Sequence, residues 1–225
     1  MTEDSVEDGE DTGETKVTVR VPLGTRLALT SVLERHQAFT HKLRSEHKAR
    51  LKHLTPEQRD ILRAEQRQEL HALRSHGELL DKKDVLVAFG LRREVQARGW
   101  NHPWQDMDWN EIPMGLFPGS TRNRSYPETL SLRLPATLVE QVRAGCWTAS
   151  KETIRQLQQW RPDHPALVLD PRAAAHEEQA AAQYQQLAAG VTTTGEVYRA
   201  GIRQGLHAAM HAAPPLITTL DPAPR

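Results

Sequence analysis

The sequence contains a single cysteine, Cys146, so the chain cannot form an intramolecular disulfide. Such sparing use of cysteine is typical of a reducing compartment, and we expect a cytoplasmic protein. There is no run of eighteen apolar residues, and the first residues are acidic, so we expect neither a membrane span nor a signal peptide. A phosphate-binding loop, a dinucleotide-binding glycine pattern and a nucleophile elbow are absent too. These absences predict a protein that is not an enzyme and needs no cofactor.

Aromatic residues account for only 5% of the chain, whereas charged residues account for 26%, and alanine, leucine and glutamine are common. A composition of this kind favours helices. The length of 225 residues suffices for one large domain or two small ones with a buried core.

The sequence also lacks a net charge, since 29 basic residues balance 29 acidic ones. Seven of the acidic residues lie within residues 1–14, which contain no basic residue, so the remaining chain carries seven excess positive charges. We expect residues 1–14 to be disordered and to serve solubility, or to compete with DNA for the basic region that follows. Residues 16–53 hold nine basic residues against two acidic ones, as phosphate binding requires. A solvated helix surface explains the part beyond residue 35 equally well.

Two stretches, residues 16–22 and 129–135, alternate polar and apolar residues and then stop at a proline, a pattern typical of a short half-buried strand. Their prolines are 113 positions apart. Residues 84–92 and 196–203 share a second motif, Gly-Leu-Arg in one copy and Gly-Ile-Arg in the other, at a spacing of 111 positions. Two matches in the same order and at nearly the same spacing indicate an internal duplication.

The duplication divides the chain into two halves, residues 15–98 and 129–212. Residues 99–128 form a linker rich in proline, and residues 213–225 form a flexible tail. The linker also contains three tryptophans that we expect to dock it on the protein, because each buries a large apolar area. These are Trp100, Trp104 and Trp109.

The strand that ends in Arg-x-Pro, followed later by a helix that begins near residue 194, resembles the ribbon-helix-helix DNA-binding family, of which Arc and MetJ are members. This resemblance implies a mainly α protein with a short two-stranded antiparallel β-ribbon, here as two tandem copies with helical insertions. In the family the outward side chains of the ribbon contact base edges in the major groove of double-stranded DNA. Carried over by position, the contacting residues are Lys16, Thr18, Arg20, Thr129, Ser131 and Arg133.

The start of the later helix resembles the family's phosphate anchor, where free amides and the helix dipole meet the DNA backbone. Thr193 and Thr194 take that position in the second half. Asp81 and Lys82 are their weaker counterparts in the first half.

The chain departs from the family because roughly sixty residues separate the strand from the later helix in each half. In the first half we expect a helix from Pro22 to about residue 54, another that starts with a capping box at Thr55, and a third at 82–98 capped by Asp81.

In the second half we expect a helix from Ala136 that Gly145 ends, and a short one capped by Thr148 or Ser150. An extended segment at 167–169 and a helix at 172–189 follow, before the last helix capped by residues 192–194. A rival alignment takes residues 150–155 as the second helix of the family motif.

We therefore expect sequence-specific binding of double-stranded DNA, by a transcriptional regulator such as a repressor or by an accessory protein of a plasmid or mobile element. The helical insertions could support a homodimer or bind a protein partner. A helical adaptor protein with a structural ribbon is the alternative. A metal-dependent hydrolase is a third possibility, with His102, Asp106, Asp108 and Glu111 as its candidate groups. His207 and His211, four residues apart, lack an evident third ligand, and Cys146 lacks a base partner.

Overall fold

The computed structural model describes residues 13–105, 107–112, 126–164 and 178–212. The described chain is mainly helical and contains a two-stranded antiparallel sheet, which confirms the predicted class. In chain order its elements are β1 (Glu14–Val21), α1 (Thr25–Leu51), α2 (Pro56–Ser75), α3 (Lys83–Ala97), β2 (Glu128–Pro135), α4 (Ala136–Trp160), a 3-10 turn (Arg161–Asp163), α6 (Glu178–Ala189) and α7 (Thr194–His211).

Among the described residues, the two halves of the chain repeat the same order of elements, a strand followed by three α-helices. The starts of α1 and α4, Thr25 and Ala136, lie 111 positions apart, and the starts of α3 and α7 have the same spacing. In the sheet Thr18 pairs with Ser131, 113 positions later and near the middle of both strands. Each strand therefore pairs with its counterpart from the other half, within one chain and about an approximate two-fold axis.

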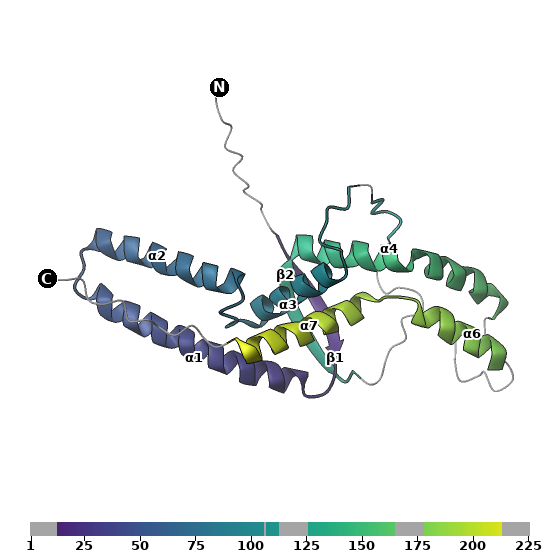
Figure 1. Cartoon of the computed structure of the whole chain (residues 1–225), viewed down its shortest axis with the longest axis horizontal. Coiled ribbons are helices and arrows are strands. Elements are labelled where there is room, and N and C mark those ends of the chain that lie inside the picture. Colours follow the sequence, from purple (N-terminus) through teal and green to yellow (C-terminus); the bar gives the residue numbers. More distant parts are fainter. Residues whose placement is uncertain (1–12, 106, 113–125, 165–177, 213–225) are drawn as a thin grey trace, which may run out of the picture.

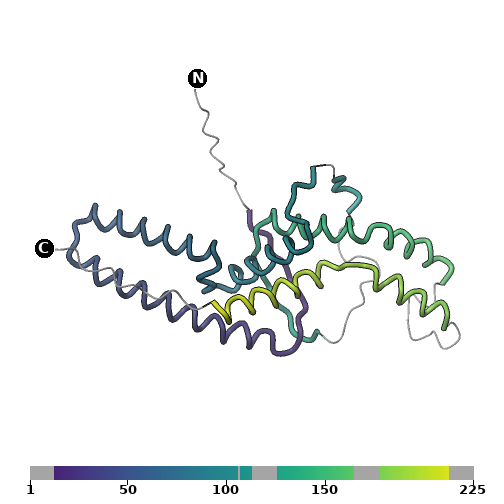
Figure 2. The backbone as a smooth tube through the Cα atoms, viewed as in Figure 1, coloured from purple at the N-terminus to yellow at the C-terminus, as the bar shows by residue number. Residues whose placement is uncertain are grey.

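The molecule has a centre and two arms (Figure 1). The centre consists of the ribbon, by which we mean β1 and β2, together with α3 and α7 (Figure 2). The helices α1 and α2 form a hairpin that we call the first arm, and α4 with α6 forms the second arm, which extends in the opposite direction. The helical insertions expected from the sequence therefore extend away from the ribbon.

The main core lies beneath one face of the ribbon. The apolar residues of the alternating pattern point into it, and Val21, Leu132 and Leu134 are at most 1% exposed. On the other side of the core, α3 and α7 cross at glycines that let their backbones meet. A Cβ atom added to Gly90 would lie 2.1 Å from the carbonyl oxygen of Gly201. The triplets that indicated the duplication thus mark the crossing of these two helices.

Each arm has its own packing. Leu43, Leu70 and Leu79 form a small separate core in the first arm. In the second arm the indole of Trp160 donates a hydrogen bond to Oε1 of Gln183, at 3.2 Å. These contacts hold the two helices of each arm together.

The helix starts expected from a capping box at Thr55 and from a cap at residues 192–194 are confirmed. Thr55 caps α2 with Gln58, and Thr193 caps α7 with Glu196, each pair through reciprocal hydrogen bonds. The side chain of Thr193 thereby fixes the first turn of α7.

Two expectations for helix boundaries are wrong. Gly145 does not end a helix, because α4 runs without a break from Ala136 to Trp160. A Cβ atom on Gly145 would lie 2.2 Å from the ring of Trp100, so this glycine serves a close side-chain contact. The rival alignment fails for the same reason, since residues 150–155 lie inside α4. Asp81 is not a helix cap either, because Lys82 takes the N-cap position and Asp81 is buried in an ion pair.

Other expectations fall outside the described residues. These are the acidic segment up to residue 12, the extended segment at 167–169, the first part of the 172–189 helix and the tail at 213–225. The expected disorder of residues 1–14 is wrong at Glu14, which is the first residue of β1. In the described part of the linker Trp100 packs against the main core, as expected, whereas Trp109 is 42% exposed.

Candidate nucleic-acid interface

The six ribbon residues that the sequence proposed as DNA contacts lie together on the outward face. The register places Lys16 opposite Arg133, Thr18 opposite Ser131, and Arg20 opposite Thr129. All six are exposed, while the residues between them are buried or half-buried. The face thus presents three positive charges and three hydroxyls in three directly opposed pairs, whose Cβ atoms lie about 5 Å apart.

The basic side chains of this face are not engaged in ion pairs within the described part of the chain. No described carboxylate lies within 4.0 Å of the charged groups of Lys16, Arg20 or Arg133. The sequence left open whether the two arginines are exposed or held beneath the insertions. They are exposed on one surface, and their donors point away from the core.

The free edges of the ribbon are covered by the first turn of α3 and by the N-terminal part of α7. The ammonium group of Lys83 donates to the carbonyl oxygen of Ser131, and the backbone amide of Arg133 donates to Oδ1 of Asp84 at 3.2 Å. At the other edge Nη1 of Arg199 donates to the carbonyl oxygen of Arg20 at 3.3 Å. Each edge therefore has hydrogen-bond partners that oppose the addition of a third strand.

No local pattern in the sequence indicated these contacts at the edges of the ribbon. Lys83 and Asp84 lie at positions where nothing in the local pattern distinguishes them from other exposed charges. Arg199 in addition stacks on the ring of Tyr126, with its Cζ atom 4.1 Å from the ring centre. The duplication alone could have indicated them. Lys83 and Asp84 lie 111 positions before Thr194 and Gly195, so they start α3 at the position where those residues start α7.

The proposed phosphate anchors lie beside the ribbon, but Thr193 is already engaged. Its hydroxyl accepts from the amide of Glu196 at 3.2 Å, and its own amide donates to Oε2 of that residue at 2.9 Å. Thr194 is half-buried in the first turn of α7. Its amide has no acceptor among the described residues and is the better placed of the two for an anion. Asp81, by contrast, is turned inward, so of the two first-half counterparts only Lys82 is exposed.

The ribbon is joined to both arms at the ends of its strands. The carboxylate of Glu128 accepts from the backbone amides of Gly24 at 2.9 Å and Arg26 at 3.0 Å, and so caps α1. These amides, first that of Arg26 and then that of Gly24, hold the pKa of Glu128 below its ordinary value. In the other half the amide of Ala136 at the start of α4 donates to the carbonyl oxygen of Gly13 at 2.8 Å. Both arms thus start from fixed positions beside the ribbon.

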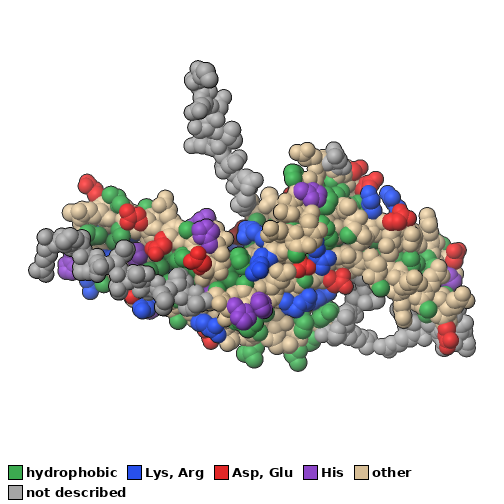
Figure 3. All heavy atoms as spheres, viewed as in Figure 1, with side chains coloured by type: hydrophobic (Ala, Val, Ile, Leu, Met, Phe, Trp, Pro, Cys, Tyr) green, Lys and Arg blue, Asp and Glu red, His purple; other side chains and the backbone are tan. Residues whose placement is uncertain are grey.

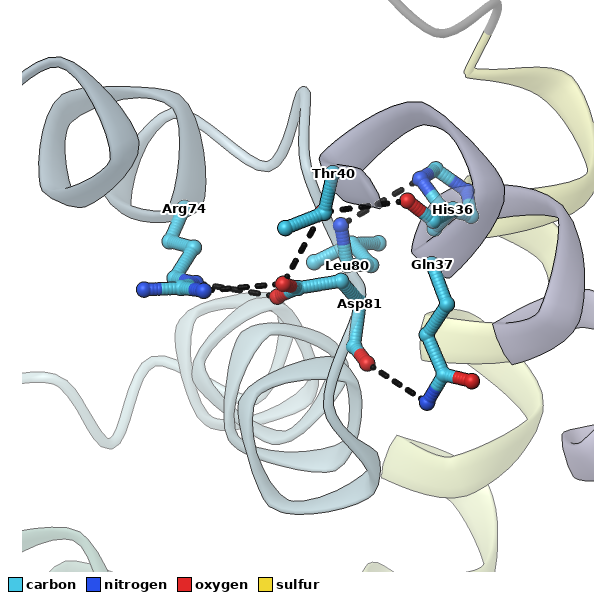
Figure 4. Close-up of polar contacts among 6 residues, drawn as sticks. All are labelled: His36, Gln37, Thr40, Arg74, Leu80 and Asp81. Carbon is cyan, nitrogen blue, oxygen red and sulfur yellow. Dashed lines mark hydrogen bonds and ion pairs between the residues drawn. The ribbon is translucent and has the colours of Figure 1, made fainter. Parts of the chain in front are cut away.

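The first arm is attached a second time through a buried polar network (Figure 4). Asp81 is 5% exposed and accepts two hydrogen bonds from the guanidinium of Arg74, at 2.9 and 2.8 Å. Its Oδ2 atom also accepts from the hydroxyl of Thr40 at 3.1 Å. Burial opposes ionisation of this carboxyl, but Arg74 and Thr40 outweigh it and hold the pKa of Asp81 below its ordinary value. The network thus connects α2, through Arg74, and α1, through Thr40, to Asp81, the residue before Lys82.

The other candidate chemistry finds little support. Within the described residues no three histidine, cysteine or acidic side chains come together as metal ligands, and Asp106 lies outside them. His102 instead contacts Trp104, with ring centres 4.2 Å apart, at a groove of about 500 Å³ beside α4. The rings of His207 and His211 are similarly 4.4 Å apart. Burial raises the pKa of the Cys146 thiol to about 12, which leaves it protonated and unreactive at neutral pH.

On the face shown in Figure 3, several lysine and arginine side chains lie near the centre with acidic ones beside them, and both kinds are also present on the arms. None of the described helices is long and apolar enough to span a membrane.

Comparison with protein-family models, with curated proteins and with solved structures finds no match.

Proposed function

We infer that this chain binds double-stranded DNA by inserting its ribbon into the major groove. The observation that carries this inference is the outward face, where three exposed cations and three hydroxyls stand in register above a buried apolar layer. Arginine can donate two hydrogen bonds to guanine, and hydroxyls can donate or accept one. The polar side chains of this face have no hydrogen-bond or ion-pair partner among the described residues, so they are suited to contact base edges.

The dimensions agree with such a contact. A two-stranded ribbon fits the major groove, which is about 12 Å wide. At roughly 3.3 Å per residue, the distance from Lys16 to Arg20 is about 13 Å, close to the rise of four base pairs. The first turn of α3 and the N-terminal part of α7 flank the ribbon where the phosphates on either side of the groove would lie.

A single chain supplies both strands, so one molecule provides the ribbon for which the family uses two. The two strands carry different outward residues, Lys-Thr-Arg in β1 and Thr-Ser-Arg in β2. We therefore expect a short site whose halves are related but not identical. A role in transcriptional regulation, or as an accessory protein of a plasmid or mobile element, is consistent with such a site.

Exchange of both ribbon arginines tests this function. We expect Arg20→Ala with Arg133→Ala to weaken binding to a preferred duplex about 100-fold, because each lost arginine–guanine pair contributes about 1–3 kcal/mol. Fluorescence anisotropy on random and genomic duplexes, repeated over a series of salt concentrations, measures the loss.

Lys151→Ala with Arg155→Ala is the matched control, since it removes two exposed charges from α4, away from the ribbon. This control should bind within about two-fold of the unchanged protein. Equal affinity of all three proteins, or no binding at low salt, would contradict DNA binding through the ribbon.

A helical adaptor protein is the second candidate, because Leu23 and Leu27, near the start of α1, are 79% and 75% exposed. Exposed leucines close together are typical of a protein-binding surface. Absence of DNA binding would favour this function.

A further inference from the structure

A line of polar and basic side chains runs along one face of α1 in the first arm. Gln37, His41, Arg44 and Lys48 follow one another at spacings of four, three and four residues, which places them on the same side of the helix. All four are exposed. The buried residues of α1, which include His36, Thr40, Leu43 and His47, lie on a different side.

This line continues toward the ribbon through the start of α3. Lys82 lines an open groove of about 320 Å³ together with Gln37, His41 and Arg44. The next residue, Lys83, donates to the backbone of β2 at Ser131. We call Lys82, His41, Arg44 and Lys48 the basic track, because they form one path from the edge of the ribbon out along the first arm.

The position of the track relative to the ribbon is fixed by hydrogen bonds at its inner end. The side-chain amide of Gln37 donates to the carbonyl oxygen of Asp81 at 3.2 Å (Figure 4). Asp81 is in turn held by Arg74 and Thr40. The track is therefore held beside the ribbon by the same network that anchors the arm.

The second arm carries no such track. At a spacing of 111 positions, the counterparts of His41, Arg44 and Lys48 are Glu152, Arg155 and Gln159, and Thr193 takes the position of Lys82. Over the whole helices, α1 has six basic and two acidic residues, whereas α4 has three and two. The two arms therefore have a similar backbone arrangement, but the first arm carries more positive charge than the second.

We propose that the basic track binds the phosphate backbone of the duplex outside the site occupied by the ribbon, on the side of the first arm only. This inference rests on the proposed function. Along α1 the track extends about 10 Å from His41 to Lys48, at 1.5 Å per residue, which is the rise of about three base pairs. The track gives affinity without sequence preference, and it orients the protein because only one arm has it.

Random-sequence duplexes of two lengths, a hairpin stem of 6 base pairs and a duplex of 24 base pairs, test the proposal with the full chain, because the shorter one has no room for the track beside the ribbon. The variant is Arg44→Ala with Lys48→Ala, and its matched control is Lys151→Ala with Arg155→Ala on the second arm. Both pairs of residues are exposed, and each double substitution removes two positive charges. Circular dichroism should therefore show the same fold in all three proteins.

The track variant should bind the 24-base-pair duplex about 10-fold more weakly at 0.1 M salt, and its slope of log K against log salt should fall by about 1.8. Its affinity for the 6-base-pair stem, and that of the control for both duplexes, should stay within about two-fold. Unchanged binding of the longer duplex, or equal losses in variant and control, would overturn the basic track while leaving the ribbon in place. If the unchanged protein binds neither duplex, the proposed function itself fails.

Discussion

Replacement of Gly90 by alanine should lower the free energy of unfolding by about 3 kcal/mol or more, the upper range for overpacking a core. The added methyl group would lie 2.1 Å from the carbonyl oxygen of Gly201 and 2.3 Å from the amide nitrogen of Gly205. Both atoms belong to backbone, so a side-chain rotation cannot relieve the clash, and α3 must move away from α7. In a chain of this length the melting temperature should fall by about 10 °C.

Chemical denaturation followed by tryptophan fluorescence measures this loss, and Gly195→Ala provides the control. Gly195 lies in the first turn of α7, where a Cβ atom would meet only the flexible end of Arg199, at 3.1 Å. Alanine there should be neutral or stabilising by up to about 1 kcal/mol, because glycine is the poorer helix former. If Gly90→Ala is as stable as Gly195→Ala, the close crossing of α3 and α7 is wrong.

Loss of the Asp81 carboxylate should have the second largest effect. Asp81→Ala leaves the guanidinium of Arg74 partly buried without its partner, and we expect a loss of about 3 kcal/mol, the lower end for a broken buried ion pair. The matched control is Asp60→Ala, because Asp60 forms an ion pair with Arg63 on the same helix, in solvent. This control should cost less than about 1 kcal/mol. Equal losses from the two substitutions would show that the network does not hold the first arm.

The same network makes the stability depend on pH in a defined direction. Because the pKa of Asp81 is lowered by folding, its ionisation stabilises the folded chain above the unfolded pKa of about 3.9. This contribution is lost as the pH falls through the lower folded pKa. The stability difference between the unchanged protein and Asp81→Asn should therefore be full at pH 6 and shrink below about pH 4. A difference that stays constant down to pH 3 would contradict the ion pair.

The parts of the fold that sequence predicted well depend on local patterns. The alternation in β1 and β2 determines which residues face the core, and the duplication suggested that the two strands could pair within one chain. The start of α2 was predictable because the capping box at Thr55 involves residues only three positions apart, and the threonines at 192–194 indicated the start of α7. The same alternation placed all six ribbon residues of the candidate site on one exposed face.

The parts that it missed depend on contacts between distant residues. Gly145 is a helix breaker by local propensity, but it lies within α4 because the ring of Trp100 packs on it. Asp81 has the residue type of a helix cap, but Arg74 and Thr40 draw it inward. The edge contacts of Lys83 and Arg199 likewise require knowledge of how the final helices lie against the strands.

Selection of binding sites from randomised duplexes tests most directly whether one chain recognises DNA through its ribbon. The protein should be used both whole and without residues 1–12, so that competition by the acidic segment cannot mask binding. We predict one chain per duplex, an enriched short sequence containing guanines, and loss of that preference in the Arg20→Ala, Arg133→Ala variant. Absence of any enriched sequence with both proteins, or an unchanged preference in the variant, would contradict this prediction.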